Sequence, residues 1–154
     1  MALTYQRERF VDLMPELPEI FYKHWQDIAL NKDAIPLDPA WKEYMRLETI
    51  GVLHVTTARD GEKLAGYIFS LVTPHLHYAK SLTAYTDLMY LRREYTRGFA
   101  WIPRYRNLIR ASENMLRDMG VQKRYLMTKV YHDMTPLFER LGYKFIEKIS
   151  AKLL

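Results

Sequence analysis

The sequence has 154 residues and contains no cysteine, and its glycines and prolines number only six and seven. The lack of cysteine excludes disulfide bonds, thiolate metal sites and cysteine nucleophiles, and it suits a reducing cytoplasm. No stretch reaches the roughly 18 uninterrupted apolar residues that a membrane span needs. The opening segment MALTYQRERF lacks the apolar run of a signal peptide. These absences favour a soluble cytoplasmic protein.

Apolar residues make up 49% of the chain, which is enough for a packed core, and the length suits one domain over residues 1–154. The net charge is +5. Much of the basic excess lies between Lys80 and Arg124, where six of the arginines are Arg92, Arg93, Arg97, Arg104, Arg106 and Arg110. Such a cluster favours an anionic partner, either a phosphate-bearing cofactor or nucleic acid, and a solvated basic face is the alternative.

The first third of the chain predicts one strand and two helices. Residues 3–8 fit a short strand. Between Phe10 and Asn31 apolar residues recur at helical spacing, and two early prolines place the regular part of this helix late. A second helix is marked by Asp38 as N-cap, Pro39 at the first helical position and Gly51 at its end.

The middle of the chain predicts antiparallel strands. Residues 52–58 and 64–72 are rich in β-forming residues, and the Asp60-Gly61 pair between them is typical of a hairpin turn. Residues 83–91 fit a third long strand. Together these segments predict a three-stranded meander.

Helices and strands alternate in the last part of the chain. After an irregular stretch at 92–102, residues 103–120 predict a helix that a proline opens and a glycine closes. Residues 125–130 predict a strand, 134–141 a short helix, and 143–153 a last strand. A meander followed by strands joined through helices predicts an α/β (α+β) fold with a mixed central sheet and helices on both faces.

The junction between the third long strand and the following helix is suited to hold phosphate. The amides in the first turn of a helix have no partners inside the helix, and the helix dipole favours negative charge there. Gly98 lets the backbone approach a ligand closely, and Arg97 can add a charge-assisted hydrogen bond. Many α/β proteins contain a strand, loop and helix with one glycine, so the pattern alone does not identify a function.

Several segments resemble the acetyl-coenzyme-A-dependent N-acetyltransferase (GNAT) superfamily. The segment YTRGFA at 95–100 is similar to its Arg/Gln-x-x-Gly-x-Gly/Ala region, and PLFERLGY at 136–143 looks like its aliphatic-Tyr-Glu-Lys-Leu-Gly-Phe signature. The resemblance covers nearly the whole chain. Further segments resemble a phage-borne branch of the superfamily: His24-Trp25, Pro36–Trp41, Thr57–Gly61, Gly66-Tyr67 and Pro74–Tyr78.

This resemblance implies a GNAT fold and direct transfer of an acetyl group from acetyl-CoA to an amine, in a bacterial host cytoplasm. The pantetheine arm of the coenzyme would lie beside Tyr90 and Leu91, bonded to free backbone groups as a strand would be. The pyrophosphate would be held by Arg97, Gly98, Phe99, Ala100 and Arg104. The acceptor is an unidentified amine on a small molecule or a protein, and a homodimer is an open alternative. Neither a metal nor a membrane is expected, and nucleic acid is not the expected partner.

Two positions depart from the superfamily pattern. Tyr95 stands where the pattern opens with Arg or Gln, and Phe138 stands where a tyrosine often serves as the acid that protonates the leaving thiolate. A phenyl ring cannot donate a proton. Two alternatives therefore stay open: a binding protein of the same fold that has lost its chemistry, and a small basic nucleic-acid-binding protein.

Three residues are candidates for proton transfer. Asp87 lies in a mostly apolar strand, where a carboxylate is costly unless it is paired or faces a wet cleft, so it is a candidate general base. The alternative is a structural partner for an arginine. Tyr131 and His132 precede the short helix and are candidates for the acid. The alternative is a plain loop before a helix that Asp133 caps.

The predicted acceptor site consists of amphipathic side chains in two short segments: His24, Trp25, His75, His77 and Tyr78. Aromatic faces and imidazoles there could contact an amine and accept its protons. The alternatives are a half-buried structural histidine at 24 and a loop whose histidines bond their own backbone. A His-x-His pair can bind metal, but no third ligand is evident nearby, so no metal is predicted.

Overall fold

The computed structural model describes residues 2–154, which form a five-stranded sheet in the order β1-β2-β3-β4-β5. The first four strands are antiparallel neighbours, and β5 runs parallel to β4. The strands are β1 (Thr4–Glu8), β2 (Leu53–Asp60), β3 (Lys63–His75), β4 (Tyr78–Leu91) and β5 (Val121–Tyr125). The mixed sheet and the meander predicted from the sequence are confirmed.

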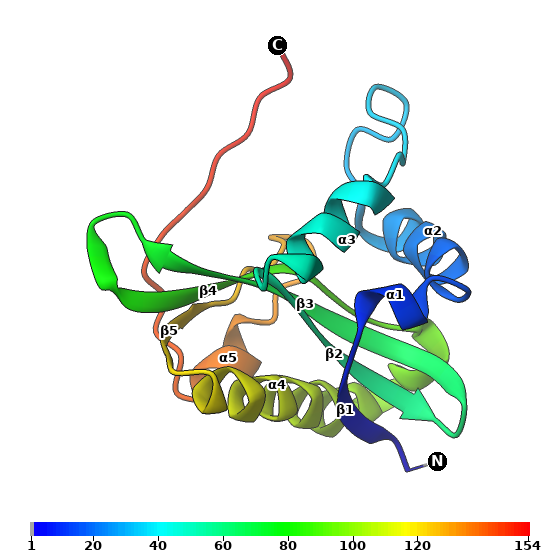
Figure 1. The fold of residues 1–154 in the computed structure, drawn as a ribbon. Coiled ribbons are helices and arrows are strands. Elements are labelled where there is room, and N and C mark those ends of the chain that lie inside the picture. Colours follow the sequence, from blue (N-terminus) through cyan, green and yellow to red (C-terminus); the bar gives the residue numbers. More distant parts are fainter. Residues whose placement is uncertain (1) are drawn as a thin grey trace.

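Helices cover both faces of this sheet (Figure 1). On one face lie α1 (Phe10–Leu13), α2 (Leu17–Ile28) and α3 (Trp41–Thr49), and on the other lie α4 (Trp101–Asp118) and α5 (Thr135–Arg140). Two short 3-10 turns, Arg93–Tyr95 and Gly98–Ala100, connect β4 to α4. Over residues 2–154, no helix combines the length and apolarity that crossing a membrane requires.

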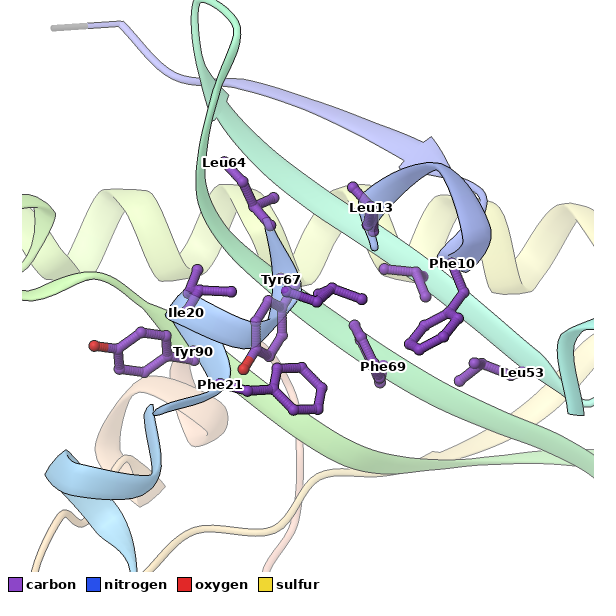
Figure 2. Close-up of a cluster of buried hydrophobic side chains, with 11 residues drawn as sticks. Phe10, Leu13, Ile20, Phe21, Leu53, Leu64, Tyr67, Phe69 and Tyr90 are labelled. Carbon is purple, nitrogen blue, oxygen red and sulfur yellow. The ribbon is translucent and has the colours of Figure 1, made fainter. Parts of the chain in front are cut away.

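The alternation of side chains along β3 builds two cores, one on each face of the sheet. Tyr67 and Phe69 are fully buried and point toward α1 and α2, where the Phe69 ring centroid lies 5.8 Å from that of Phe10 (Figure 2). Ile68, between them, faces the opposite way and packs with Leu108 and other residues of α4. The sheet is therefore anchored on both faces at the middle of β3.

The second predicted helix begins later than the sequence indicates. Asp38 and Pro39 lie outside α3, because the amide of Trp41 donates to the carbonyl of Pro39 at 2.8 Å and closes a tight turn before the helix. The Trp41 ring then packs against Phe21 with centroids 5.0 Å apart. Tertiary packing thus decides where the helix starts. Its end is as predicted, since Gly51 follows with a φ of 76°.

Two strands predicted late in the chain are wrong. The strand predicted at 125–130 lies instead at 121–125, because only those residues run alongside β4. Residues 143–153 form no strand, since no strand of the described chain runs beside them. Phe145 and Ile149 in this segment are 63% and 76% exposed. Alternating apolar residues supply the side chains of a strand, but a partner must supply its hydrogen bonds.

Candidate functional site

β4 and β5 separate halfway along β4. They pair only from Leu82 with Val121 to Tyr85 with Tyr125. At the point of separation the rings of Tyr85 and Tyr125 stack, with centroids 4.5 Å apart and planes at 3°. Beyond them, residues 86–91 of β4 have no strand along their outer edge. Such an edge exposes unpaired backbone groups that a ligand can pair with in place of a strand.

A β-bulge lies at the start of this open edge. Thr86 pairs with Ser70 and Leu88 with Phe69, so Asp87 is an extra residue without a partner in β3. The Asp87 side chain is exposed, and the hydroxyl of Tyr44 in α3 donates to its Oδ2 at 3.0 Å. Asp87 is thus a solvent-accessible carboxylate at the bulge, and it is hydrogen-bonded to a tyrosine rather than to an arginine.

Tyr44 is held in its protonated form. Burial of its ring, followed by the nearby Asp87 carboxylate, raises the pKa of Tyr44 well above its ordinary value. A protonated hydroxyl donates to the carboxylate and fixes its orientation. Nothing in the sequence links Tyr44 to Asp87, because the two residues are brought together only by the packing of α3 on the sheet.

The open edge of β4 presents backbone donors at alternate residues. The amide of Arg92 donates toward β3, to the carbonyl of Ala65 at 2.9 Å. Alternation along the strand therefore directs the amides of Met89 and Leu91 to the outer edge. The Leu91 amide is already bonded to the hydroxyl of Tyr105 at 3.1 Å. The Met89 amide thus faces the open edge, where it can donate to a ligand carbonyl.

The side chains of Tyr90 and Leu91 are buried rather than turned to a ligand, with 5% and 2% exposed. The Tyr90 ring stacks on the His24 ring at 4.6 Å, and its hydroxyl donates to Asp27 at 2.8 Å. At this position the open edge therefore offers the backbone of β4, which is the part of Tyr90 and Leu91 that the resemblance implies for the pantetheine arm.

His24 is a core residue. Its Nδ1 lies 2.9 Å from the hydroxyl of Tyr67, and only 4% of the residue is exposed. Burial lowers the pKa of His24 to about 4, so the imidazole is neutral at pH 7. The fold therefore supports the alternative that His24 is a structural histidine and not part of the acceptor site.

The loop between β4 and α4 forms the second part of the site. Gly98 has a φ of 59°, a conformation that other residues adopt at a cost, and Arg97 and Phe99 on either side of it are exposed. With Ala100 these residues lead into α4, whose first turn contains no acidic residue. The amides and the dipole of this helix start favour a bound anion.

Arg104 is engaged inside the loop rather than turned to a ligand. Its guanidinium donates to the carbonyl of Tyr95 at 2.6 Å and lies over the Tyr95 ring at 5.7 Å from the centroid. The Tyr95 hydroxyl in turn donates to Asp60 at 2.9 Å. Arg104 and Tyr95 therefore brace the loop against the β2–β3 hairpin, and the pyrophosphate contact of Arg104 stays a prediction.

Two further arginines of the basic cluster also serve the fold. Arg92 is 3% exposed and makes two hydrogen bonds to Glu19 in α2, at 3.1 and 2.9 Å. Arg93 pairs with Asp27 at 2.7 Å. Both arginines thereby tie α2 to the end of β4. The arginine beside Gly98 that remains available to an anion is Arg97.

Tyr131 and His132 lie in the loop between β5 and α5, on the other side of the opening. The Tyr131 hydroxyl donates to the carbonyl of Ile28 at the end of α2, while the side chain stays 51% exposed. His132 is exposed, and its amide donates to the carbonyl of Lys129 at 3.0 Å. Phe138 is 6% exposed and belongs to the core under the sheet.

The five residues of the predicted acceptor site do not come together. His24 contacts Tyr67 in β3, and His75 lies eight residues farther along the same strand, about 26 Å away at 3.3 Å per residue. His75, His77 and Tyr78 form a group at the β3–β4 hairpin, with the rings of His75 and Tyr78 5.0 Å apart.

Trp25 lies in α2, away from the hairpin group, and stacks on Tyr22 with ring centroids 6.0 Å apart. The single acceptor site that combined α2 with the hairpin is therefore wrong, and only the hairpin group stays together. Among residues 2–154 there is no cluster of three or more His, Cys, Asp or Glu side chains that could hold a metal ion.

The fold is that of GNAT acetyltransferases. A transcriptional regulator from Bacillus halodurans superimposes with a TM-score of 0.74 at 17% identity, covering 99% of this chain and 100% of its own. An aminoglycoside acetyltransferase from an uncultured soil metagenomic sample, in complex with sisomicin, gives 0.70 at 16% identity, covering 99% and 94%. A predicted acetyltransferase with acetyl-CoA from Clostridium acetobutylicum gives 0.67 at 15% identity, covering 99% and 96%.

At these identities the likeness shows the fold and leaves the activity open. No family model matches the sequence. No curated protein matches it either.

Proposed function

We propose that the protein is an N-acetyltransferase that moves an acetyl group from acetyl-CoA to an amine by direct transfer. The observation that carries the proposal is the separation of β4 from β5 after Tyr85 and Tyr125, which leaves the outer edge of residues 86–91 without a neighbouring strand, just before the loop that leads into α4. An open strand edge suits an extended chain with amide groups, and a helix start suits phosphate. Pantetheine and pyrophosphate are joined in that order in coenzyme A.

The residues that would hold the coenzyme are mainly backbone groups. The Met89 amide faces the open edge, and the amides of Gly98, Phe99 and Ala100 lie at the start of α4, with the Arg97 guanidinium beside them. When bound, acetyl-CoA supplies an activated acetyl thioester. A fixed backbone donor such as the Met89 amide stabilises negative charge without having to reorganise.

Asp87 is the group that we assign to accept a proton from the amine, directly or through a water molecule. It is exposed at the bulge where the open edge begins, and Tyr44 orients its carboxylate at 3.0 Å. We assign Tyr131 or His132, on the loop after β5, to supply the proton that the departing thiolate needs. The sequence segments shared with a phage-borne branch support a bacterial cytoplasm as the place of action.

Calorimetric titration with coenzyme A tests the binding step. The charge-reversing variant Arg97→Glu should weaken binding at least tenfold. The matched control is Arg110→Glu, an exposed arginine about 13 Å farther along α4. Ligand at about 100 times its dissociation constant should stabilise the fold by about 2.7 kcal/mol. A titration without heat, together with an unmoved melting curve, would rule the proposal out.

Release of coenzyme A thiol in the presence of a panel of amines tests the chemistry. Asp87→Asn should lower turnover by roughly 10²- to 10⁴-fold while coenzyme binding is retained. Full turnover in this variant would exclude Asp87 as the base. Coenzyme binding without turnover on any amine would indicate the inactive binding protein, which the buried Phe138 in place of a tyrosine favours.

A further inference from the structure

We propose that a pocket beside the β3–β4 hairpin is the acceptor site, and that it takes a small monoamine carrying a planar aromatic ring. The role as acceptor site depends on the proposed acetyl transfer. The ring preference depends only on the pocket, which has a volume of about 320 Å³ and is lined by Thr73, Pro74, His75, Leu76, His77, Thr83 and Tyr85.

The pocket opens on the face of the sheet that carries α1, α2 and α3. Thr73 pairs with Thr83 and Tyr85 pairs with Leu71, so their side chains share the face of Tyr67 and Phe69. The hairpin projects past α3, and no helix covers this part of the sheet (Figure 1). Tyr85 is accordingly 39% exposed.

Aromatic and imidazole rings form the walls. The Tyr85 ring borders the pocket and is backed by Tyr125, which is stacked on it at 4.5 Å. On the hairpin side, the imidazole of His75 lies 5.0 Å from the ring of Tyr78, and its Nδ1 accepts a hydrogen bond from the amide of His77 at 3.1 Å. Rigid, partly exposed rings of this kind favour a planar ring in the ligand.

Volume restricts the ligand further. A volume of 320 Å³ lies at the small end of the range of about 300–1,000 Å³ for ligand pockets. The lining itself contains no carboxylate, and the carboxylates near it are Asp87 on β4 and Glu147, whose charge reaches Tyr85. The ammonium group of Lys123 lies over the Tyr125 ring at 4.9 Å from its centroid. On volume, a monoamine with one ring therefore fits better than a larger polycation.

The pocket is also correctly placed for the chemistry. Asp87 lies two residues beyond Tyr85 on β4, about 7 Å along the strand, and Tyr44 holds its carboxylate on the α3 side of the sheet. An amine joined to its ring by a short chain can thus reach the carboxylate while the ring rests against Tyr85. This arrangement places the reacting nitrogen where the open edge of β4 begins.

Binding of phenylethylamine to the protein without coenzyme tests the ring preference, with cyclohexylethylamine as the saturated counterpart and spermidine as the polycation. Phenylethylamine should bind about three- to tenfold more tightly than cyclohexylethylamine, and Tyr85→Leu should abolish that difference while Tyr85→Phe keeps it. The matched control is Tyr22→Leu, another exposed tyrosine, on α2. Equal binding of the two amines, preferential binding of spermidine, or an unchanged preference in Tyr85→Leu would overturn the proposal.

A second variant and a coenzyme titration separate this proposal from the function on which it rests. His75→Ala with His77→Ala should weaken phenylethylamine binding and leave coenzyme A affinity unchanged. Failure of the wild-type protein to bind coenzyme A would refute the acetyltransferase proposal, and with it the role of the pocket as acceptor site. If the coenzyme binds and phenylethylamine is acetylated no faster than cyclohexylethylamine, the acceptor class is wrong while the acetyltransferase proposal stands.

Discussion

Replacement of Gly66 by alanine tests the open edge of β4 by pushing on that strand from its β3 side. Gly66 lies in β3, opposite Leu91, and a Cβ added to it would stand 2.3 Å from the carbonyl oxygen of Tyr90 and 2.9 Å from the Cα of Leu91. Ordinary contact begins at 3.4 Å, so the backbone of β4 would have to retreat by about 1 Å. The atoms that block the Cβ are mainly backbone, which cannot turn aside as the end of a side chain can.

The shift should cost both stability and coenzyme binding. Overpacking of this kind destabilises by about 1 to 3 kcal/mol, which lowers the melting temperature of a chain of this size by about 2 to 12 °C. The same movement displaces the neighbouring Met89 amide along the open edge, and misplacement by about 1 Å can cost up to 10²-fold in function. Thermal unfolding and calorimetric titration with coenzyme A measure the two effects separately.

Gly51→Ala is the matched control. A Cβ there meets nothing within 4 Å, and its φ of 76° alone should cost about 1 to 2 kcal/mol without moving β4. If Gly66→Ala melts at the wild-type temperature, β3 and β4 do not approach as closely as described. If it is destabilised and still binds coenzyme A normally, the open edge of β4 is not where the coenzyme lies.

Three further outcomes are expected. The pKa of Glu8 is lowered from 4.5 to about 2, mainly by hydrogen bonds from Arg59. The ionised carboxylate therefore adds up to about 3 kcal/mol to the free energy of unfolding above pH 4.5, and this contribution is lost as the pH falls toward 2. Glu8→Gln should therefore be less stable than the wild type at pH 7, and its free energy of unfolding should fall less steeply between pH 4.5 and 2. An equally steep fall in the variant would contradict this. Tyr44→Phe should lower turnover about tenfold or more, at unchanged coenzyme affinity, because it removes a donor to the Asp87 carboxylate; equal turnover would show that the orientation of Asp87 does not matter. Ile149→Ser should change the free energy of unfolding by no more than about 0.5 kcal/mol, because the side chain is 76% exposed, and a larger loss would mean that this segment packs as a strand after all.

The parts of the fold that the sequence predicts well are those decided by a few neighbouring residues. The hairpin at Asp60-Gly61 and the helix ends at Gly51 and Gly120 depend on local conformation, and each of these glycines has a positive φ. The strand predicted at 125–130 depends instead on where β4 can accept a partner. Local propensity cannot show that β5 ends at Tyr125, because the limit is set by the separation of two strands far apart in sequence.

In the candidate site, too, features set by neighbouring residues are predicted well and features set by tertiary packing are not. The basic loop around Gly98 is a local feature, and its predicted place at the start of a helix is confirmed. The partner of Asp87 is not local, since Tyr44 lies 43 residues earlier and reaches the bulge only through the packing of α3. His24 gives the opposite case, because its helical spacing with Leu17, Phe21 and Ile28 already allowed the interpretation as a half-buried structural histidine, although its stacking on Tyr90 depends on the fold.

The arginine cluster shows why counting charges overstates the case for nucleic acid. Among its six members, Arg92 and Arg93 pair with carboxylates of α2, and Arg104 bonds a carbonyl within its own loop. A guanidinium paired with a carboxylate already has its charge compensated, so Arg92 and Arg93 leave fewer salt-sensitive contacts on this face than the sequence suggests. What is left at the start of α4 is a compact set of backbone amides with Arg97 beside them. Such a set suits the single pyrophosphate of the proposed coenzyme better than the repeated phosphates of a nucleic acid backbone, because the amides belong to three consecutive residues at one helix start.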